Sequence, residues 1–124
     1  MSIITIATDF GSSDGYTGAL CGVIKSIALD AEIIQITDEL SSIAKAALTI
    51  FRYYSFFPEG TIHLMVLDPT VGSSRRALAG ECGSRFFVGP DNGIFTRIIN
   101  AHTDSKWHAI DQPRLPNTKI SSTF

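Results

Sequence analysis

Short apolar runs alternate with longer stretches of helical spacing along the first half of the chain. Buried strands are indicated by IITIAT (Ile3–Thr8), EIIQIT (Glu32–Thr37) and TIHLMVL (Thr61–Leu67), which are rich in apolar and β-branched residues. Between these runs, apolar residues recur at helical spacing over Tyr16–Leu29 and Ile43–Phe57. This β-α-β-α-β order predicts a parallel sheet with right-handed crossovers.

Both predicted helices have boundary signals. Asp14 is the expected N-cap of the first helix, because a short acidic side chain there accepts hydrogen bonds from the first turn. Pro58 and Gly60 are expected to end the second helix, since neither residue continues a helix well.

The second half of the chain changes to β-type runs joined by short turns. Two strands are predicted by RALAGEC and RFFVG, which meet at the Gly83-Ser84 turn. A turn at PDNG can start a short helix, IFTRIINA, before a last strand, KWHAI. We therefore predict an α/β domain over residues 1–111, with a mainly parallel sheet flanked by helices. Residues 112–124 contain two prolines and few core residues, which indicates an extended connector.

Composition narrows the class of partner. The 124 residues are 44% hydrophobic and 18% charged, which is enough for one domain with a real core. The net charge is −2 and the basic residues are scattered, so neither nucleic acid nor an anionic membrane is an expected partner. No apolar run reaches membrane-spanning length. Cys21 and Cys82 form no CxxC motif, so we expect two buried free thiols and a cytoplasmic location.

Three aspartates occupy equivalent positions in the predicted sheet. Asp9, Asp38 and Asp68 each follow directly on a predicted parallel strand. Ligands of open α/β sheets bind outside the carboxyl ends of the strands, so these side chains are expected at one edge. Asp is also common in loops and helix caps. An ordinary loop or cap role explains a single aspartate at such a position better than it explains three at equivalent positions.

The residue types at this edge restrict the ligand. There is no GxGxxG motif or P-loop, and carboxylates repel phosphates, so a dinucleotide or nucleoside triphosphate is not expected. A divalent metal, the hydroxyls of a sugar and a cation remain open. Arg75-Arg76 argues against a metal, because a cation beside the site competes with it. Arg75 lies seven residues past Asp68, across a small-residue loop that allows the guanidinium to pair with the carboxylate.

The histidines suggest no catalytic set. His63 lies in an apolar strand and is expected to be packed in the core, while His102 and His108 have no partner that the sequence indicates. A Ser-His-Asp or Cys-His arrangement cannot be assembled from these positions.

Three segments carry a family resemblance: TDFGSSDGYTGALCGVI, FPEGTIHLMVLDPTVGSSRRAL and GPDNGIFT. With them the chain resembles the S-adenosyl-L-methionine (SAM) hydrolases, or SAM hydroxide adenosyltransferases, which are related to fluorinating and chlorinating enzymes. The resemblance implies an N-terminal α/β domain joined to a smaller β-rich C-terminal domain, in a homotrimer with sites between subunits. It implies that SAM is the small-molecule substrate, that water converts it to adenosine and L-methionine, and that neither metal nor cofactor takes part.

The resemblance also assigns roles. Asp68 and Arg75 match the first two members of an Asp-Arg-His set that positions and activates water, and Asp9 matches the acid that holds the ribose hydroxyls. The helix start at Asp14, Gly15 and Tyr16 offers N–H groups to the methionine carboxylate, and Asp14 is placed to take the methionine ammonium.

The chain departs from the family pattern at Asp38, where His is usual, and at Thr70, where Gly is usual. The pattern also continues with TFHGRD, whereas the sequence ends at Phe124, before that His. We therefore expect an N-terminal domain that is weakly active or inactive alone. Two alternatives stay open: a non-catalytic domain that binds a nucleoside, and a carboxylate-dependent metal phosphohydrolase.

Overall fold

A computed structural model gives the structure of residues 2–68 and 76–110. Their elements follow in the order β1 (Ile3–Thr8), α1 (Tyr16–Ile27), β2 (Glu32–Thr37), α2 (Ile43–Tyr53), the 3-10 helix η1 (Tyr54–Phe56), β3 (Ile62–Val66), β4 (Ala77–Cys82), β5 (Arg85–Pro90), α3 (Thr96–Ala101) and β6 (Lys106–Ile110). The connector predicted over residues 112–124 lies outside this part of the chain.

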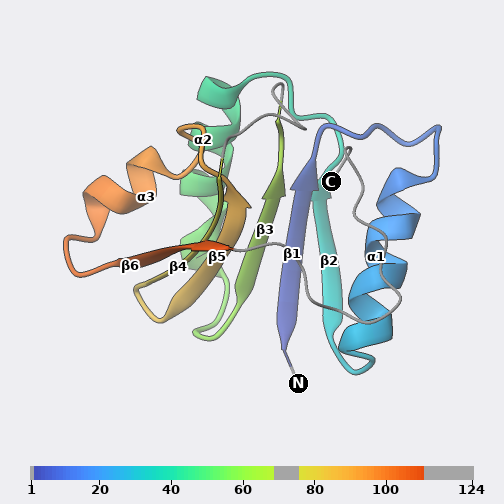
Figure 1. The fold of residues 1–124 in the computed structure, drawn as a ribbon, viewed down its shortest axis with the longest axis horizontal. Helices are drawn as coiled ribbons and strands as arrows, with labels where there is room; N and C mark the ends of the chain where they lie inside the picture. The colour runs from blue at the N-terminus through green and yellow to red at the C-terminus, as the bar shows by residue number, and fades with distance from the viewer. Residues whose placement is uncertain (1, 69–75, 111–124) are drawn as a thin grey trace.

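The strands form one sheet in the order β2-β1-β3-β5-β4-β6 (Figure 1). Strands β2, β1, β3 and β5 run parallel, while β4 pairs antiparallel with β5 and β6. The predicted α/β fold with a mainly parallel sheet is therefore confirmed. The β4–β5 turn has positive φ at Gly83 (57°) and Ser84 (62°), the left-handed pair that a two-residue hairpin requires.

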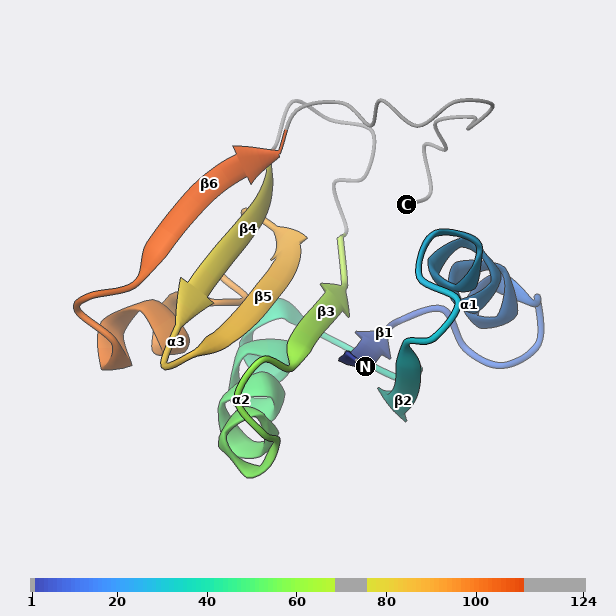
Figure 2. The same cartoon turned by 90° about the horizontal axis from the view of Figure 1, so that it is seen from below.

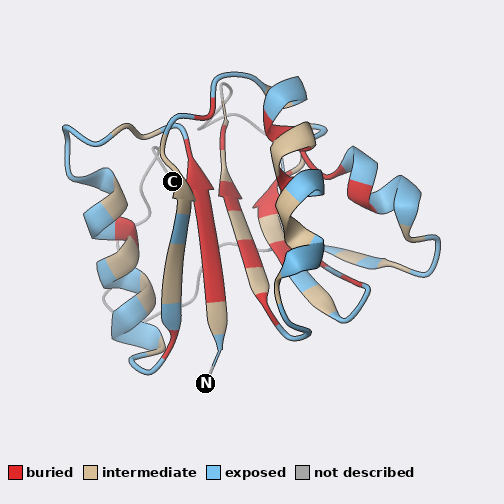
Figure 3. Cartoon of the chain, turned by 180° about the vertical axis from the view of Figure 1, so that it is seen from behind, coloured by how far each residue is buried: buried red, intermediate tan, exposed pale blue. Residues whose placement is uncertain are grey.

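Helices cover both faces of the sheet. Figure 2 shows α1 on one face and α2 with α3 on the other. Strand β1 lies between them and is almost wholly buried (Figure 3). The α2 side buries an apolar cluster that includes Ile50, Met65, Phe87 and Ile98. On the α1 side, Ile6 and its neighbours form a second, smaller cluster, so the core is divided into two layers by the sheet.

Part of the α1-side face has no cover within the described residues. Alternation along β5 directs Phe87 to the α2 side, so Phe86 and Val88 face the other way. The paired residue Ala79 of β4 shares that side, and Phe86 is 40% exposed. A shallow apolar hollow of about 320 Å³ lies here and includes Ile62 in its lining. We call this surface the open face.

Both long helices end earlier than the sequence predicted. Helix α1 stops at Ile27 rather than Leu29, and the Lys25 ammonium donates to the carbonyls of Leu29 and Ala31 beyond it. Helix α2 stops at Tyr53 instead of Phe57, and one 3-10 turn follows. Phe57 itself is not helical, because Pro58 pushes the residue before it into extended backbone.

The third helix is also shorter than predicted, because α3 begins at Thr96 rather than Ile94. Ile94 and Phe95 belong to the core instead, with exposed fractions of 0% and 2%. Both cysteines are free thiols; Cys82 is buried as predicted, whereas Cys21 is only half-buried. Among the described helices, none has the length and apolar character needed to cross a membrane.

Candidate functional site

The three aspartates lie where the sequence predicted them. Asp9, Asp38 and Asp68 follow the carboxyl ends of β1, β2 and β3, which are parallel neighbours in the sheet. Asp9 is exposed, and Asp38 and Asp68 are half-buried. All three are therefore placed at the same edge.

The edge contains the topological switch point of the sheet. From β1 the chain crosses to β2 by way of α1 on one face, and from β2 it returns to β3 by way of α2 on the other. The crevice of an open α/β sheet opens at such a point, here between β1 and β3. Asp9 and Asp68 flank it, and the Asp9 amide donates to the Val66 carbonyl at 3.2 Å.

The loop after β1 is held to this edge by its own contacts. The Gly11 amide, at φ 71°, donates to the Asp38 carbonyl at 2.8 Å. The ring of Phe10 packs against that of Tyr16, with centroids 5.8 Å apart. Because Phe10 is the neighbour of Asp9, this ring contact ties the start of α1 to the end of β1.

Asp14 is not the N-cap of α1, and that prediction was wrong. Gly15 occupies the N-cap with φ 75°, and no side chain caps the helix there. The left-handed backbone that this turn needs favours glycine, which moves the cap one residue past Asp14. Asp14, Gly15 and Tyr16 are exposed at the helix start.

Two further polar residues lie at this edge, and the sequence analysis did not assign them to it. Strand β5 is parallel to β3, so the turn after Pro90 brings Asp91 and Asn92 to the same edge. The Asn92 amide donates to the Leu67 carbonyl at 2.9 Å, directly before Asp68. The signal was present in the sequence, because PDNG follows a β-type run as the other three acids do.

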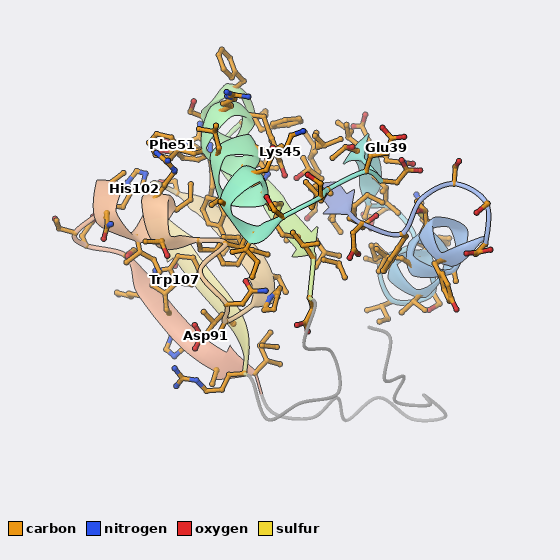
Figure 4. The ribbon with its side chains drawn as sticks, turned by 90° about the horizontal axis from the view of Figure 1, so that it is seen from above. Glu39, Lys45, Phe51, Asp91, His102 and Trp107 are labelled. Carbon is orange, nitrogen blue, oxygen red and sulfur yellow. The ribbon has the colours of Figure 1, made fainter. Side chains whose placement is uncertain are left out.

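Arg76 has a partner in this turn. Its Nε and Nη2 both donate to Asp91 Oδ2, at 3.2 and 2.8 Å, and the Asp91 amide donates to the Arg76 carbonyl at 2.8 Å. Figure 4 looks onto the edge and shows Asp91 at its β4 side and Glu39 at its β2 side. The predicted Asp68–Arg75 pair involves a residue outside the described part of the chain.

His63 and His102 lie away from this edge, at the amino end of β3 and beside the Gly83 turn. His63 is fully buried, as predicted; burial, and secondarily the positive charge of Arg85, lower its pKa to about 4. Its Nδ1 is 2.7 Å from Thr5 Oγ1. His102 has a partner that the sequence did not reveal, since its Nε2 is 2.9 Å from the Tyr54 hydroxyl oxygen. In residues 2–68 and 76–110, no group of three or more His, Cys, Asp or Glu side chains is placed to hold a metal ion.

These features define an open α/β protein whose candidate ligand site is a carboxylate-rich edge at the switch point between β1 and β3. A family model described as the SAM hydroxide adenosyltransferase N-terminal domain matches residues 4–124, and the chain belongs to this family. The family resemblance inferred from the sequence is thereby confirmed.

Relatives and solved structures agree with this assignment. The (R)-S-adenosyl-L-methionine hydrolase of Methanocaldococcus jannaschii is 38% identical over the whole chain, which spans 48% of that protein. A hydrolase of the same name from Thermus thermophilus is 35% identical over 77% of the chain and 38% of its own length. The fluorinase of Actinopolyspora mzabensis is more distant, at 22% identity over 98% of the chain and 49% of its own length.

An uncharacterized conserved protein from Thermotoga maritima has the same fold, with a TM-score of 0.87 and 33% identity over the whole chain and 49% of its own length. The chain thus spans about half the length of the relatives it matches.

Proposed function

We propose that this protein, at the full length of its relatives, hydrolyses SAM to adenosine and L-methionine. The observation that carries the proposal is the placement of Asp9 and Asp68 on either side of the β1–β3 switch point, in a chain 38% identical to a protein named for this activity. The reaction needs no metal or cofactor.

The chemistry suits a site built from carboxylates. A water oxygen attacks C5′ of the ribose, the C5′–S bond breaks, and its electron pair leaves with sulfur as the neutral thioether of methionine. The proton of the water is released. Because a sulfonium leaves readily, the protein has to position and polarise the water, which is a matter of orientation and electrostatics.

Asp68 is the proposed acceptor of the hydrogen bond from that water, and Arg75 is its proposed partner. Asp9, exposed at the end of β1, is proposed to accept hydrogen bonds from the ribose 2′ and 3′ hydroxyls. These two carboxylates belong to adjacent strands joined by the Asp9–Val66 backbone bond. That bond supports a fixed spacing between the sugar and the water.

The start of α1 is the proposed site for the methionine end. The first helical bond, from the Ala19 amide to the Gly15 carbonyl, leaves the earlier amides of the helix without partners in the helix. No side chain caps the helix at Gly15, and the first turn of α1 is the proposed site of the methionine carboxylate. Asp14, one residue before, is the proposed acceptor for the ammonium, and the ring contact of Tyr16 with Phe10 holds this end near Asp9.

The assembled enzyme is proposed to be a cytoplasmic homotrimer. The His that follows Phe124 in the family pattern is proposed to complete the catalytic set, and a C-terminal domain is proposed to cover the adenine. Residues 1–124 alone are therefore proposed to be weakly active or inactive. No element of residues 2–68 and 76–110 covers the open face, where Phe86 is 40% exposed beside an apolar hollow, and this supports a protein that makes further contacts there.

The test measures which product receives the oxygen atom of the attacking water. A full-length form is made by joining residues 1–124 to the part of the M. jannaschii relative beyond the match, and it is incubated with SAM in H₂¹⁸O. The curated hydrolases are named for the (R) form, so each sulfonium form is assayed separately. Attack at C5′ predicts one ¹⁸O in adenosine and none in methionine. Unlabelled adenosine would contradict the mechanism, and adenosine binding without turnover would favour the nucleoside-binding alternative.

A further inference from the structure

The turn after β5 contacts both sides of the segment that separates β3 from β4. Asn92 donates to the carbonyl of Leu67, directly before Asp68, and Asp91 pairs with Arg76 directly before β4. The two neighbouring residues of one turn therefore fix the chain on either side of residues 69–75.

The hydrogen bond from Asn92 to the Leu67 carbonyl lies just beyond the last paired residues of β3. The last pairs of β3 are Val66 with Thr8 on one side and Leu64 with Val88 on the other. Leu67 lies beyond both, and its side chain is 6% exposed. A buried carbonyl requires a donor, and the Asn92 amide supplies it at 2.9 Å.

The orientation of the Asn92 amide is itself fixed. Its Oδ1 accepts from the Ile94 amide at 3.3 Å while its Nδ2 donates to the Leu67 carbonyl. Ile94 is fully buried in the α2-side core. Each end of the amide thus has a defined partner, and the bond connects the core to the main chain one residue before Asp68.

We propose that Asn92 is a positioning residue for Asp68. It holds the Leu67 carbonyl, and through it the backbone from which the Asp68 carboxylate extends toward the attacking water. This inference rests on the proposed function. It predicts that loss of the Asn92 donor displaces the carboxylate without removing any contact to the ribose or methionine.

The test uses Asn92→Asp and Asn92→Ala in the full-length form. Asn92→Asp keeps the acceptor for Ile94 and removes the donor to Leu67, while Asn92→Ala removes both without adding charge. A displacement of about 1 Å costs on the order of 100-fold, so we expect kcat to fall roughly 10- to 100-fold in both variants. The KM for SAM is expected to stay within about twofold, since a positioning defect acts on the transition state rather than on substrate binding.

The matched control is Thr61→Val at the other end of β3. Thr61 is 1% exposed and its hydroxyl donates to the Pro58 carbonyl at 2.7 Å, so this change also removes a side-chain bond to a main-chain carbonyl. It is expected to lower the melting temperature as much as Asn92→Ala does, with kcat unchanged. An equal loss of kcat in Thr61→Val would assign the effect to stability and overturn the inference.

The remaining outcomes separate this inference from the proposed function. If the full-length form releases no adenosine from SAM, the proposed function fails. If Asp68→Asn retains the wild-type rate, SAM hydrolysis stands, but Asp68 is not catalytic and the positioning role of Asn92 is overturned. If Asp68→Asn is inactive while Asn92→Ala turns over normally, the proposed function stands and the positioning role of Asn92 is overturned. A loss of kcat in Asn92→Asp but not in Asn92→Ala would be an effect of the added charge, and it would also overturn the positioning role of Asn92.

Discussion

Thr5 and His63 contact each other across the β1–β3 pair, with the threonine Oγ1 2.7 Å from the imidazole Nδ1. Both side chains are fully buried, and the His63 ring packs against the rings of Tyr53 in α2 and Phe87 in β5. Burial lowers the pKa of His63 to about 4, from an ordinary value of 6.5. The folded protein therefore holds this imidazole neutral at a pH where the unfolded chain already protonates it.

The sign of the resulting pH dependence follows from the direction of the shift. The contribution of His63 to the free energy of unfolding is complete above pH 6.5 and is lost as the pH falls from 6.5 toward 4. We expect a loss of about 2 kcal/mol between pH 7.5 and pH 5 from this group. Urea unfolding at both pH values measures it. In His63→Gln, which does not titrate, that share of the pH dependence should disappear; an unchanged difference would contradict the assignment.

Gly80 lies directly under the ring of Trp107, and an added Cβ there would overlap the ring. Gly80→Ala is expected to lower the free energy of unfolding by roughly 1–3 kcal/mol, because the ring or the β4–β6 pair must shift. The control is Gly22→Ala in α1, where an added Cβ meets nothing within 4 Å. That change should stabilise the protein by about 0.5–1 kcal/mol. Chemical denaturation measures the free energy of unfolding of both variants. Equal values for Gly80→Ala and Gly22→Ala would contradict the close packing of Gly80 against Trp107.

Asp9 is proposed to hold the ribose, so its charge should matter for nucleoside binding. Asp9→Asn in the full-length form should weaken adenosine binding about tenfold or more, because hydrogen bonds to a charged acceptor are worth about 1.5–3 kcal/mol. Isothermal titration with adenosine gives the dissociation constant. Asp30→Asn is the control, since Asp30 precedes β2 at the opposite edge of the sheet and should leave affinity unchanged. Normal affinity in Asp9→Asn would remove Asp9 from the ribose site.

The open face predicts self-association of residues 1–124. Phe86 is 40% exposed there, beside the apolar hollow lined by Ile62 and Val88. Sedimentation velocity of these residues should show oligomers that decrease in Phe86→Glu. Phe56 is 86% exposed on η1, away from the open face, so Phe56→Glu should leave the distribution as in the parent chain. Equal effects of both substitutions would show that general exposure, and not this face, causes association.

The sequence predicted the parts of the fold that depend on local pattern. Strand and helix order followed from apolar periodicity, and the edge shared by Asp9, Asp38 and Asp68 followed from the parallel arrangement. It did not reveal that β5 lies next to β3, because a hairpin pattern does not say which of its strands joins the sheet. Asn92 was missed for that reason. The Tyr54–His102 contact joins residues 48 positions apart, a separation that no local pattern encodes.

The central claim is that the full-length enzyme hydrolyses SAM through Asp68 and that residues 1–124 alone do so poorly or not at all. The decisive measurement is adenosine formation from SAM by chromatography, for the full-length form, its Asp68→Asn variant and residues 1–124, at equal concentration. We predict steady release by the full-length form and a loss of about 1,000-fold or more in Asp68→Asn, as when one member of a catalytic set is removed. Residues 1–124 are predicted to release little. Full turnover by Asp68→Asn, or by residues 1–124 alone, would contradict the account.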